Sequence, residues 1–231
     1  MDTVVVTGAS RGVGKAVAEL FADRGANVVA CSRRQGDIET VTASIEADGG
    51  SATAVRADVR DEFDVERLME TAARTGETDA IDCVIANAGI YHGAAGETPL
   101  SAEEYTDFDD TLRTNVRGVF STLREATPHL SADARAFVPS GRIAREAMDG
   151  FGAYAVSKAG AEAVARQFAV ESDTPTAVLD LGQLETELTG HDGGRKPAEI
   201  APMFWWAATE ADAETVDGAV LRLREWKKAT R

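Results

Sequence analysis

The sequence predicts a doubly wound α/β fold, in which helices cover both faces of a seven-stranded parallel sheet. Three observations support this prediction. A β-branched run at residues 3–6 leads directly into a glycine-rich turn and then into an amphipathic helix. Six further strand candidates alternate with helical patterns, and such alternation is typical of a parallel sheet. A chain of 231 residues, 44% of them hydrophobic, is long enough to bury the core of one such unit.

The seven strand candidates lie at residues 3–6, 27–31, 52–57, 80–86, 134–139, 176–181 and 218–224. No Pro/Gly/Ser-rich linker, internal repeat or low-complexity stretch divides the chain. We therefore expect residues 1–231 to form a single domain that carries both the cofactor site and the substrate site.

The first turn reads Thr7-Gly8-Ala9-Ser10-Arg11-Gly12-Val13-Gly14. A strand, a glycine turn and a helix form the phosphate cradle of dinucleotide-binding folds. The glycines let the backbone approach a pyrophosphate, and the helix N-terminus supplies free N–H groups. The alternative is that the glycines only close a tight turn. The spacing, Gly-x-x-x-Gly-x-Gly, together with the flanking elements favours the cradle.

A tyrosine and a lysine lie four residues apart, at Tyr154 and Lys158. On a helix the two side chains share one face, about one turn apart. A cation held there can lower the pKa of a neighbouring phenol enough for it to exchange protons near neutral pH. The alternative is an exposed pair on a helix surface, since the motif alone arises easily by chance.

The chain resembles the short-chain dehydrogenase/reductase family over nearly its whole length, in the single-domain branch with the Thr-Gly-x-x-x-Gly-x-Gly turn. Further landmarks follow in the family's order: Asp58-Val59, Asn87-Ala88-Gly89, Asn115, Ser140, Tyr154 with Lys158, and then Gly182 and Thr186. The resemblance implies a Rossmann fold and an NAD(P)-dependent enzyme acting on alcohol or carbonyl groups. It implies that the cofactor is bound by Gly8, Ser10, Arg11, Gly12, Val13, Gly14, Arg33, Asp58, Val59, Asn87, Ala88, Gly89, Tyr154, Lys158, Gly182 and Thr186.

The resemblance also assigns four catalytic roles. Tyr154 would be the general acid, Lys158 would lower the pKa of Tyr154, and Ser140 would stabilise charge on the substrate oxygen. Asn115 would anchor a water molecule that relays protons to Lys158, although an asparagine there can also kink or cap a helix. Ser140 lies fourteen residues before Tyr154, whereas a strict count of thirteen lands on Gly141. An inserted loop residue would restore Ser140, which we expect to be the catalytic serine.

The second strand candidate ends Cys31-Ser32-Arg33-Arg34, with a serine where NAD-dependent enzymes of this fold place a carboxylate. Arg33 can pair with a 2′-phosphate, and Arg11 lies where it can clamp that phosphate from the other side. The alternative is that both arginines are surface charges. We therefore expect NADP(H) to be preferred over NAD(H).

The net charge of −15, with 24 Lys plus Arg against 39 Asp plus Glu, makes a nucleic-acid partner unlikely because such a surface repels phosphate backbones. An acidic, lysine-poor surface is typical of proteins from salt-loving organisms, and the alternative is an ordinary acidic protein.

Asp2 and the first strand occupy the positions where a signal peptide would have its charged leader and apolar core. We therefore expect a cytoplasmic protein without a membrane span. We expect free core thiols at Cys31 and Cys83, and no metal site, because His92, His129 and His191 lack ligand spacing.

Two function classes follow from the sequence. The first is an NADP-dependent oxidoreductase acting on a small carbonyl or alcohol substrate, with a pocket of mixed polarity formed by Ile90, Tyr91, His92, Met148 and Phe151. The alternative is a catalytically lapsed NADP-binding sensor or interaction protein on the same fold. By the resemblance, helices around 103–127 and 153–171 carry subunit contacts, with small residues at Ala159, Ala163 and Ala165. We expect a homotetramer or homodimer.

Overall fold

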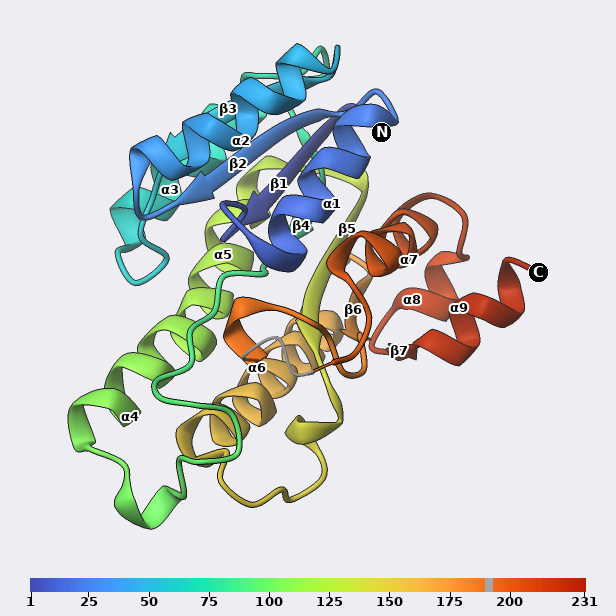
Figure 1. The fold of residues 1–231 in the computed structure, drawn as a ribbon. Helices are drawn as coiled ribbons and strands as arrows, with labels where there is room; N and C mark the ends of the chain where they lie inside the picture. Colours follow the sequence, from blue (N-terminus) through green and yellow to red (C-terminus); the bar gives the residue numbers. More distant parts are fainter. Residues whose placement is uncertain (190–192) are drawn as a thin grey trace.

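The computed structural model, which describes residues 1–189 and 193–231, contains a seven-stranded sheet in the order β3-β2-β1-β4-β5-β6-β7 (Figure 1). All neighbouring strands are parallel. The predicted doubly wound Rossmann fold is therefore confirmed. The strand order reverses between β1 and β4, so the connections leave these two strands in opposite directions and open a crevice beyond their carboxyl ends.

The strands lie close to their predicted positions: β1 Thr3–Thr7, β2 Asn27–Ser32, β3 Ser51–Arg56, β4 Ile81–Ile85, β5 Leu130–Ser140, β6 Thr176–Asp180 and β7 Val220–Arg222. Two differ from the prediction. Strand β5 begins four residues earlier than expected because Leu130 pairs with Ile81, before an irregularity in the register. Strand β7 is shorter because its last predicted residues begin a helix at Leu223.

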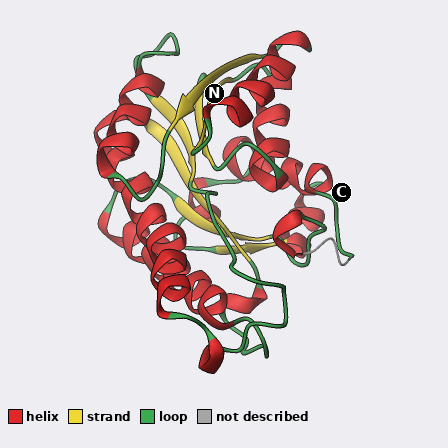
Figure 2. Ribbon diagram, turned by 60° about the vertical axis from the view of Figure 1, so that its left-hand side comes forward, coloured by secondary structure: helices red, strands yellow, loops and turns green. Residues whose placement is uncertain are grey.

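Helices cover both faces of the sheet (Figure 2). One core cluster joins residues of α1 (Gly12–Asp23), α2 (Gln35–Ala47) and α7 (Pro197–Thr209) to the sheet. Two other clusters join residues of α3 (Glu62–Ala73), α5 (Gly118–Ala126) and α6 (Gly152–Glu171) to it. The remaining helical elements are α4 (Tyr105–Leu112), α8 (Ala213–Val216), α9 (Leu223–Ala229), a π-helical turn (Arg113–Arg117) and 3-10 turns at Leu100–Ala102, Thr127–His129, Arg142–Ala144 and Glu187–Thr189.

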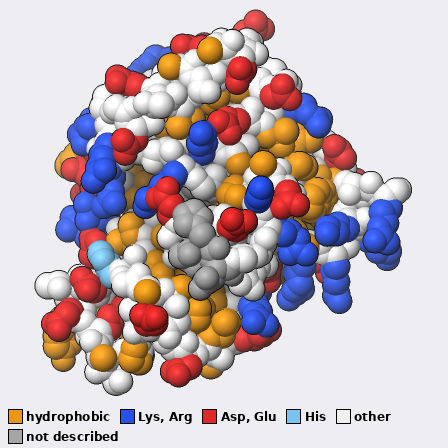
Figure 3. Space-filling model, in the orientation of Figure 1, with side chains coloured by type: hydrophobic (Ala, Val, Ile, Leu, Met, Phe, Trp, Pro, Cys, Tyr) orange, Lys and Arg blue, Asp and Glu red, His pale blue; other side chains and the backbone are white. Residues whose placement is uncertain are grey.

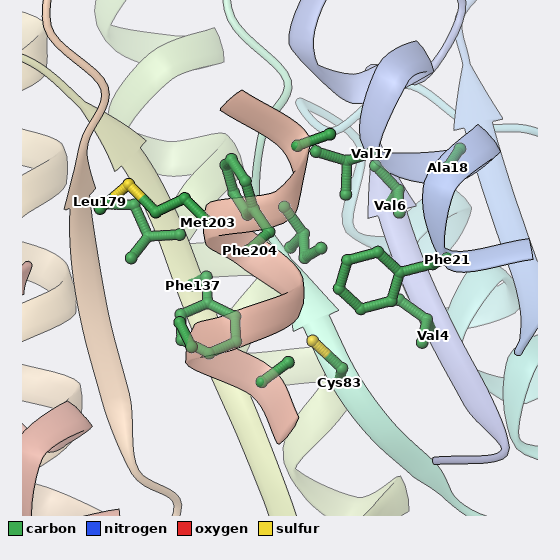
Figure 4. Close-up of a cluster of buried hydrophobic side chains, with 14 of the residues drawn as sticks. Val4, Val6, Val17, Ala18, Phe21, Cys83, Phe137, Leu179, Met203 and Phe204 are labelled. Atoms are coloured by element: carbon green, nitrogen blue, oxygen red, sulfur yellow. The ribbon is translucent and has the colours of Figure 1, made fainter. Parts of the chain in front are cut away.

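Alternate residues of each central strand point to opposite faces of the sheet, and both faces are buried. Val4 and Val6 of β1 belong to the cluster beneath α1 and α7, whereas Val5 belongs to the cluster beneath α3. Figure 4 shows the first cluster, in which Phe21 of α1, Phe137 of β5 and Phe204 of α7 fill the space between the helices and the sheet. Burial on both faces explains why the strands appear as continuous apolar runs in the sequence.

Both cysteines lie in this core. Cys31 and Cys83 are buried and form no disulfide, as predicted. Burial raises the pKa of the Cys31 thiol to about 12, and it raises the pKa of Cys83 as well. Both thiols therefore stay protonated and unreactive at neutral pH.

Charged side chains are distributed unevenly over the surface. Acidic residues are scattered over the face in Figure 3, whereas basic residues gather at its left-hand edge and over β7 and α9 at the C-terminal end. That basic end includes Arg222, Arg224, Lys227, Lys228 and Arg231. Among the helices that the structure describes, none is long and apolar enough to cross a membrane.

Candidate active site

A cavity of about 1100 Å³ lies beyond the carboxyl ends of the strands. Its walls come from the segments after β1, β2, β4, β5 and β6 and from the start of α6, elements that are far apart in the sequence. Most of the predicted site residues line it: Gly8, Ser10, Arg11, Gly12, Val13, Arg33, Val59, Asn87, Ala88, Gly89, Ser140, Tyr154, Lys158, Gly182 and Thr186. Three predicted residues, Gly14, Asp58 and Asn115, lie behind its walls.

Two glycines of the turn, Gly8 and Gly14, are packed so tightly that side chains would not fit there. Gly8 has a φ of +66°, and a Cβ there would lie 2.7 Å from the Cα of Ala88. A Cβ at Gly14 would lie 2.4 Å from both the carbonyl oxygen of Gly8 and Nδ2 of Asn87. Helix α1 begins at Gly12, which lines the cavity, so the first backbone N–H groups of the helix lie at the cavity wall.

Hydrogen bonds fix this turn to the segment after β4. The Thr7 hydroxyl accepts bonds from the backbone N–H groups of Asn87 and Ala88, each at 3.0 Å. The Asn87 side chain in turn donates to the carbonyl oxygens of Thr7 at 2.9 Å and Gly8 at 3.2 Å. These bonds hold the first turn and the loop after β4 together across the crevice.

Tyr154 and Lys158 lie on one face of α6 and both line the cavity. The Lys158 ammonium donates to the carbonyl oxygen of Pro139 at 3.1 Å and lies 5.7 Å from the centre of the Tyr154 ring. Burial lowers the pKa of Lys158 to about 8. Burial raises the pKa of Tyr154, and the neighbouring Tyr91 raises it further.

These shifts differ from the expectation that Lys158 lowers the pKa of Tyr154. The physical reason is desolvation, which disfavours the charged form of both groups in this site. A phenol with a raised pKa is protonated at neutral pH, so Tyr154 holds the proton that an acid catalyst must donate.

Ser140 is the last residue of β5, and its buried Oγ has no hydrogen-bond partner among the described residues. An unpaired buried hydroxyl is costly and calls for a partner from outside the chain. Ser140 and Gly141 both line the cavity, and of the two only Ser140 has a hydroxyl group. The assignment of Ser140 as the catalytic serine stays a prediction.

Asn115 lies in the π-helical turn that joins α4 to α5, so the predicted helix over 103–127 is interrupted at this residue. Its side-chain oxygen accepts from the Ile90 N–H at 2.8 Å. Its amide group donates to the carbonyl oxygen of Ile90 and to the Ser157 hydroxyl, both at 2.9 Å. Asn115 thus fixes the loop after β4 to the helix that carries Tyr154. The π turn directs the Asn115 side chain toward these two segments.

Asp58 and Arg11 are engaged in ion pairs. The Asp58 carboxylate pairs with Arg60 at 2.6 Å, and Arg60 also pairs with Asp110 of α4. These bonds to Arg60 outweigh desolvation and lower the pKa of Asp58. Arg11 pairs across the mouth of the cavity with Glu187. The Arg60 bridge could not be read from the sequence because it joins segments fifty residues apart.

The expected substrate residues divide into two groups. Ile90, Met148 and Phe151 line the cavity. The Tyr91 hydroxyl instead bonds to the carbonyl oxygen of Gly150 at 3.0 Å, with its ring stacked on Phe151. His92 lies 3.1 Å from Asp110, beside a smaller, separate pocket. Four apolar residues of the cavity were not predicted as substrate residues: Ala95, Ile143, Leu184 and Leu188. Ile143 and Leu188 lie in short 3-10 turns, and the other two lie outside the helices, so no regular pattern marks them in the sequence.

No group of three or more His, Cys, Asp or Glu side chains suited to a metal ion occurs within residues 1–189 and 193–231. Of the three histidines, His191 lies outside the described residues.

Comparison with known proteins relates this site to a family. The profile of the family described as short chain dehydrogenase matches residues 2–191. An uncharacterized oxidoreductase of Listeria monocytogenes is 33% identical over 152 residues, which cover 65% of this chain and 57% of that protein. The match thus spans little more than half of that relative's own length.

Two solved structures share the fold over nearly the whole chain. A short chain dehydrogenase from Burkholderia cenocepacia in complex with NADP has a TM-score of 0.84 at 25% identity, covering 96% of this chain and 95% of that one. A 3-ketoacyl-(acyl-carrier-protein) reductase from Brucella melitensis complexed with NADH has the same score and identity, covering 96% of each chain.

The lowered pKa of Lys158 predicts how stability depends on pH. Between pH 8 and the ordinary lysine value of 10.5, the unfolded chain binds a proton at Lys158 that the folded protein has lost. The unfolding free energy of the wild type should therefore rise with pH in this window relative to Lys158→Met, by at most about 1.4 kcal/mol per pH unit. Denaturant titrations of both proteins measure the difference, and a difference that is flat across the window would contradict the burial of this ammonium.

Proposed function

Because the chain belongs to the short-chain dehydrogenase family, we propose that it is an NADP-dependent oxidoreductase that interconverts a carbonyl group and an alcohol, with Tyr154 as general acid and base. The observation that carries this proposal is the meeting of Tyr154, Lys158 and Ser140, whose buried hydroxyl is unpaired among the described residues, in the lining of one cavity. These three residues come from two segments and line the same cavity as the glycine turn.

The residues present fit a dinucleotide. The glycine turn leaves no room for side chains at Gly8 and Gly14, so backbone N–H groups can approach a pyrophosphate. The cavity runs from Arg33 after β2 to Tyr154 on α6 and includes Val59, Asn87, Ala88 and Gly89 along one wall. Gly182 and Thr186 would close the other wall. Asp58 does not line the cavity, so it would contribute by holding the backbone just before Val59.

A nicotinamide dinucleotide, when bound, supplies hydride to a substrate carbon or accepts it. Ser140 would hold the substrate oxygen through its free hydroxyl and stabilise the charge that develops there. Tyr154 would donate its phenolic proton to the same oxygen in reduction and take it back in oxidation. Lys158, with a pKa near neutrality, can exchange a proton with its surroundings, and Asn115 would keep the helix and the loop after β4 in register.

The preference for NADP(H) rests on the side chains after β2. Ser32, whose hydroxyl donates to the carbonyl oxygen of Arg34 at 2.8 Å, offers no carboxylate to a ribose. Arg33 is exposed at the cavity, where it can pair with a 2′-phosphate. Arg11 would have to leave Glu187 to join it. The first carboxylate after Ser32, Asp37 of α2, also lines the cavity and is the residue that would favour NAD(H) instead.

The test of the proposed reaction is a panel of aldehydes, ketones and alcohols assayed with NADPH or NADP⁺ in molar KCl. On any substrate so found, Tyr154→Phe should lower kcat by about 10²–10⁴-fold, because the ring remains and only the proton donor is lost. Dinucleotide affinity, measured by fluorescence titration, should be unchanged. A mutant that keeps more than about a tenth of the wild-type kcat would show that Tyr154 is not the acid.

The cofactor preference is tested by titrating both dinucleotides. Arg33→Ala should weaken NADPH binding by about 10- to 100-fold, since a hydrogen bond to a charged group contributes about 1.5–3 kcal/mol, and should leave NADH binding nearly unchanged. Arg124→Ala, which removes an exposed arginine of α5, is the control. An equal loss for both dinucleotides at Arg33→Ala, or a wild type that prefers NADH, would overturn the preference.

We further propose a cytoplasmic homodimer or homotetramer from a salt-rich environment. The charge of −15 with lysine at only positions 15, 158, 196, 227 and 228 supports the environment. Exposed apolar side chains on α4, α5 and α6, namely Tyr105, Phe120 and Val156, support a subunit contact there. Ala159 and Ala163 are exposed on the same helix, but Ala165 is buried and cannot contribute.

Light scattering in molar KCl should therefore show a dimer or tetramer. Tyr105→Glu should shift the assembly toward monomer, because a carboxylate buried in an apolar contact is unfavourable, while Phe63→Glu, at an exposed apolar position of α3, should not. A wild type that is monomeric at all protein concentrations would contradict the proposed assembly.

A further inference from the structure

A buried cluster of charges lies beside the catalytic residues and takes no part in the proposed reaction. Arg145 follows the 3-10 turn after β5, Asp180 ends β6, and Glu162 lies in α6. Arg145 pairs with Asp180 and lies 3.4 Å from Glu162. The carboxylate side chains are only 11% and 1% exposed, and that of Arg145 is 28% exposed.

Such a cluster needs an explanation other than stability. Removing charges from water costs about as much as their attraction returns, and apolar replacements of a buried ion pair are often neutral or stabilising. The Glu162 Oε1 atom also lacks a hydrogen-bond partner among the described residues. The arrangement is therefore better explained by what it holds in place.

Asp180 holds the turn that follows β6. Its Oδ1 atom accepts a hydrogen bond from the N–H of Gly182 at 3.1 Å, so the side chain spans the turn. Gly182 has a φ of +68°, a conformation that other residues rarely adopt. The turn contains Leu181 rather than a proline that would fix φ, so the carboxylate supplies a restraint that the backbone lacks.

Arg145 links this turn to a second loop of the cavity. Ser140 and Asp180 are paired in the sheet, and the Leu181 N–H bonds to the carbonyl oxygen of Ser140 at 3.1 Å. Beyond these paired residues the two segments separate. The segment after β5 forms the loop with Ile143 and Met148, and the segment after β6 contains Leu184. The Arg145–Asp180 pair is a charged contact between the loop after β5 and the end of β6, where the second segment begins.

Glu162 connects the same pair to the catalytic helix. It lies four residues after Lys158 on α6, one turn farther along the same face. Its Oε1 faces Arg145 at 3.4 Å, whereas Oε2 lies 3.9 Å from Arg166, a more exposed residue of the same helix. The three charges thus join the two loops to the helix that carries Tyr154 and Lys158.

We propose that Arg145 and Asp180 are positioning residues, which clamp the loop after β5 and the turn after β6 around the substrate end of the cavity. This proposal rests on the proposed function for its catalytic consequence. Ser140 precedes one loop and Gly182 begins the other, so loosening the clamp would misplace the groups that face the substrate. A displacement of about 1 Å can cost about 10²-fold in rate.

Four variants test the clamp. Asp180→Ala removes both the bond to Gly182 and the charge that holds Arg145, whereas Asp180→Asn keeps an acceptor for Gly182. Arg145→Lys keeps the charge, and Arg166→Met removes the other partner of Glu162 as the matched control. Hydrogen exchange followed by mass spectrometry reports on the loops at 141–151 and 181–188 without requiring turnover.

Asp180→Ala should speed exchange in both loops and lower kcat by about 10–10²-fold, with a smaller change in the KM for dinucleotide. Arg145→Lys should recover most of the kcat. Asp180→Asn, which keeps the acceptor for Gly182 but not the charge that holds Arg145, should still speed exchange at 141–151 and recover only part of the kcat. Arg166→Met should match the wild type in exchange and kcat. Unchanged exchange in Asp180→Ala, or equal effects of Arg166→Met, would overturn the clamp.

If Asp180→Ala does not fold, Asp180→Asn provides the test. Exchange at 141–151 as slow as in the wild type would then overturn the link to Arg145. If exchange is faster in Asp180→Ala but even the wild type shows no turnover, the proposed function is refuted and the clamp is still supported.

Discussion

The contact between Thr7 and Asn87 is the interaction on which the rest of the site depends. It joins β1 to the segment after β4 where the strand order reverses, and it leaves space for the glycine turn but not for side chains there. From that segment, Asn115 binds Ile90 and then Ser157, whose hydroxyl donates to the carbonyl oxygen of Tyr154 at 2.8 Å. These hydrogen bonds therefore connect the glycine turn to the helix that carries Tyr154.

Burial sets the chemistry of the helix that carries Tyr154. Because the start of α6 packs against the end of β5, desolvation raises the pKa of Tyr154 and lowers that of Lys158. The phenol keeps its proton, and the ammonium loses its own more readily than an exposed lysine would. Burial is thus the main cause of both shifts, and the proposed acid role of Tyr154 depends on the protonated phenol.

The fold could be predicted because its signals are local: buried strands leave apolar runs, and the glycine turn needs three glycines at fixed spacing. Many residues of the cavity were predictable for the same reason, since they directly follow a strand, and Tyr154 and Lys158 were predictable from their spacing on one helix. Contacts between distant segments were not predictable. Nothing near Asp58 in the sequence indicates the tie from Arg60 to Asp110, and nothing near Arg145 indicates that Asp180 and Glu162 surround it. The π turn at Asn115 could not be predicted either, because the helical sequence pattern continues on both sides of it.

The central claim is that this cavity transfers hydride and does not merely bind a dinucleotide. The most direct measurement is a single turnover with NADPH deuterated at C4 of the nicotinamide, followed by mass spectrometry of the alcohol formed from a ketone. One deuterium on the carbinol carbon, absent with Tyr154→Phe, is the result that our account predicts. Tight binding of NADPH with no label in any product across the panel would contradict it and favour a sensor on the same fold.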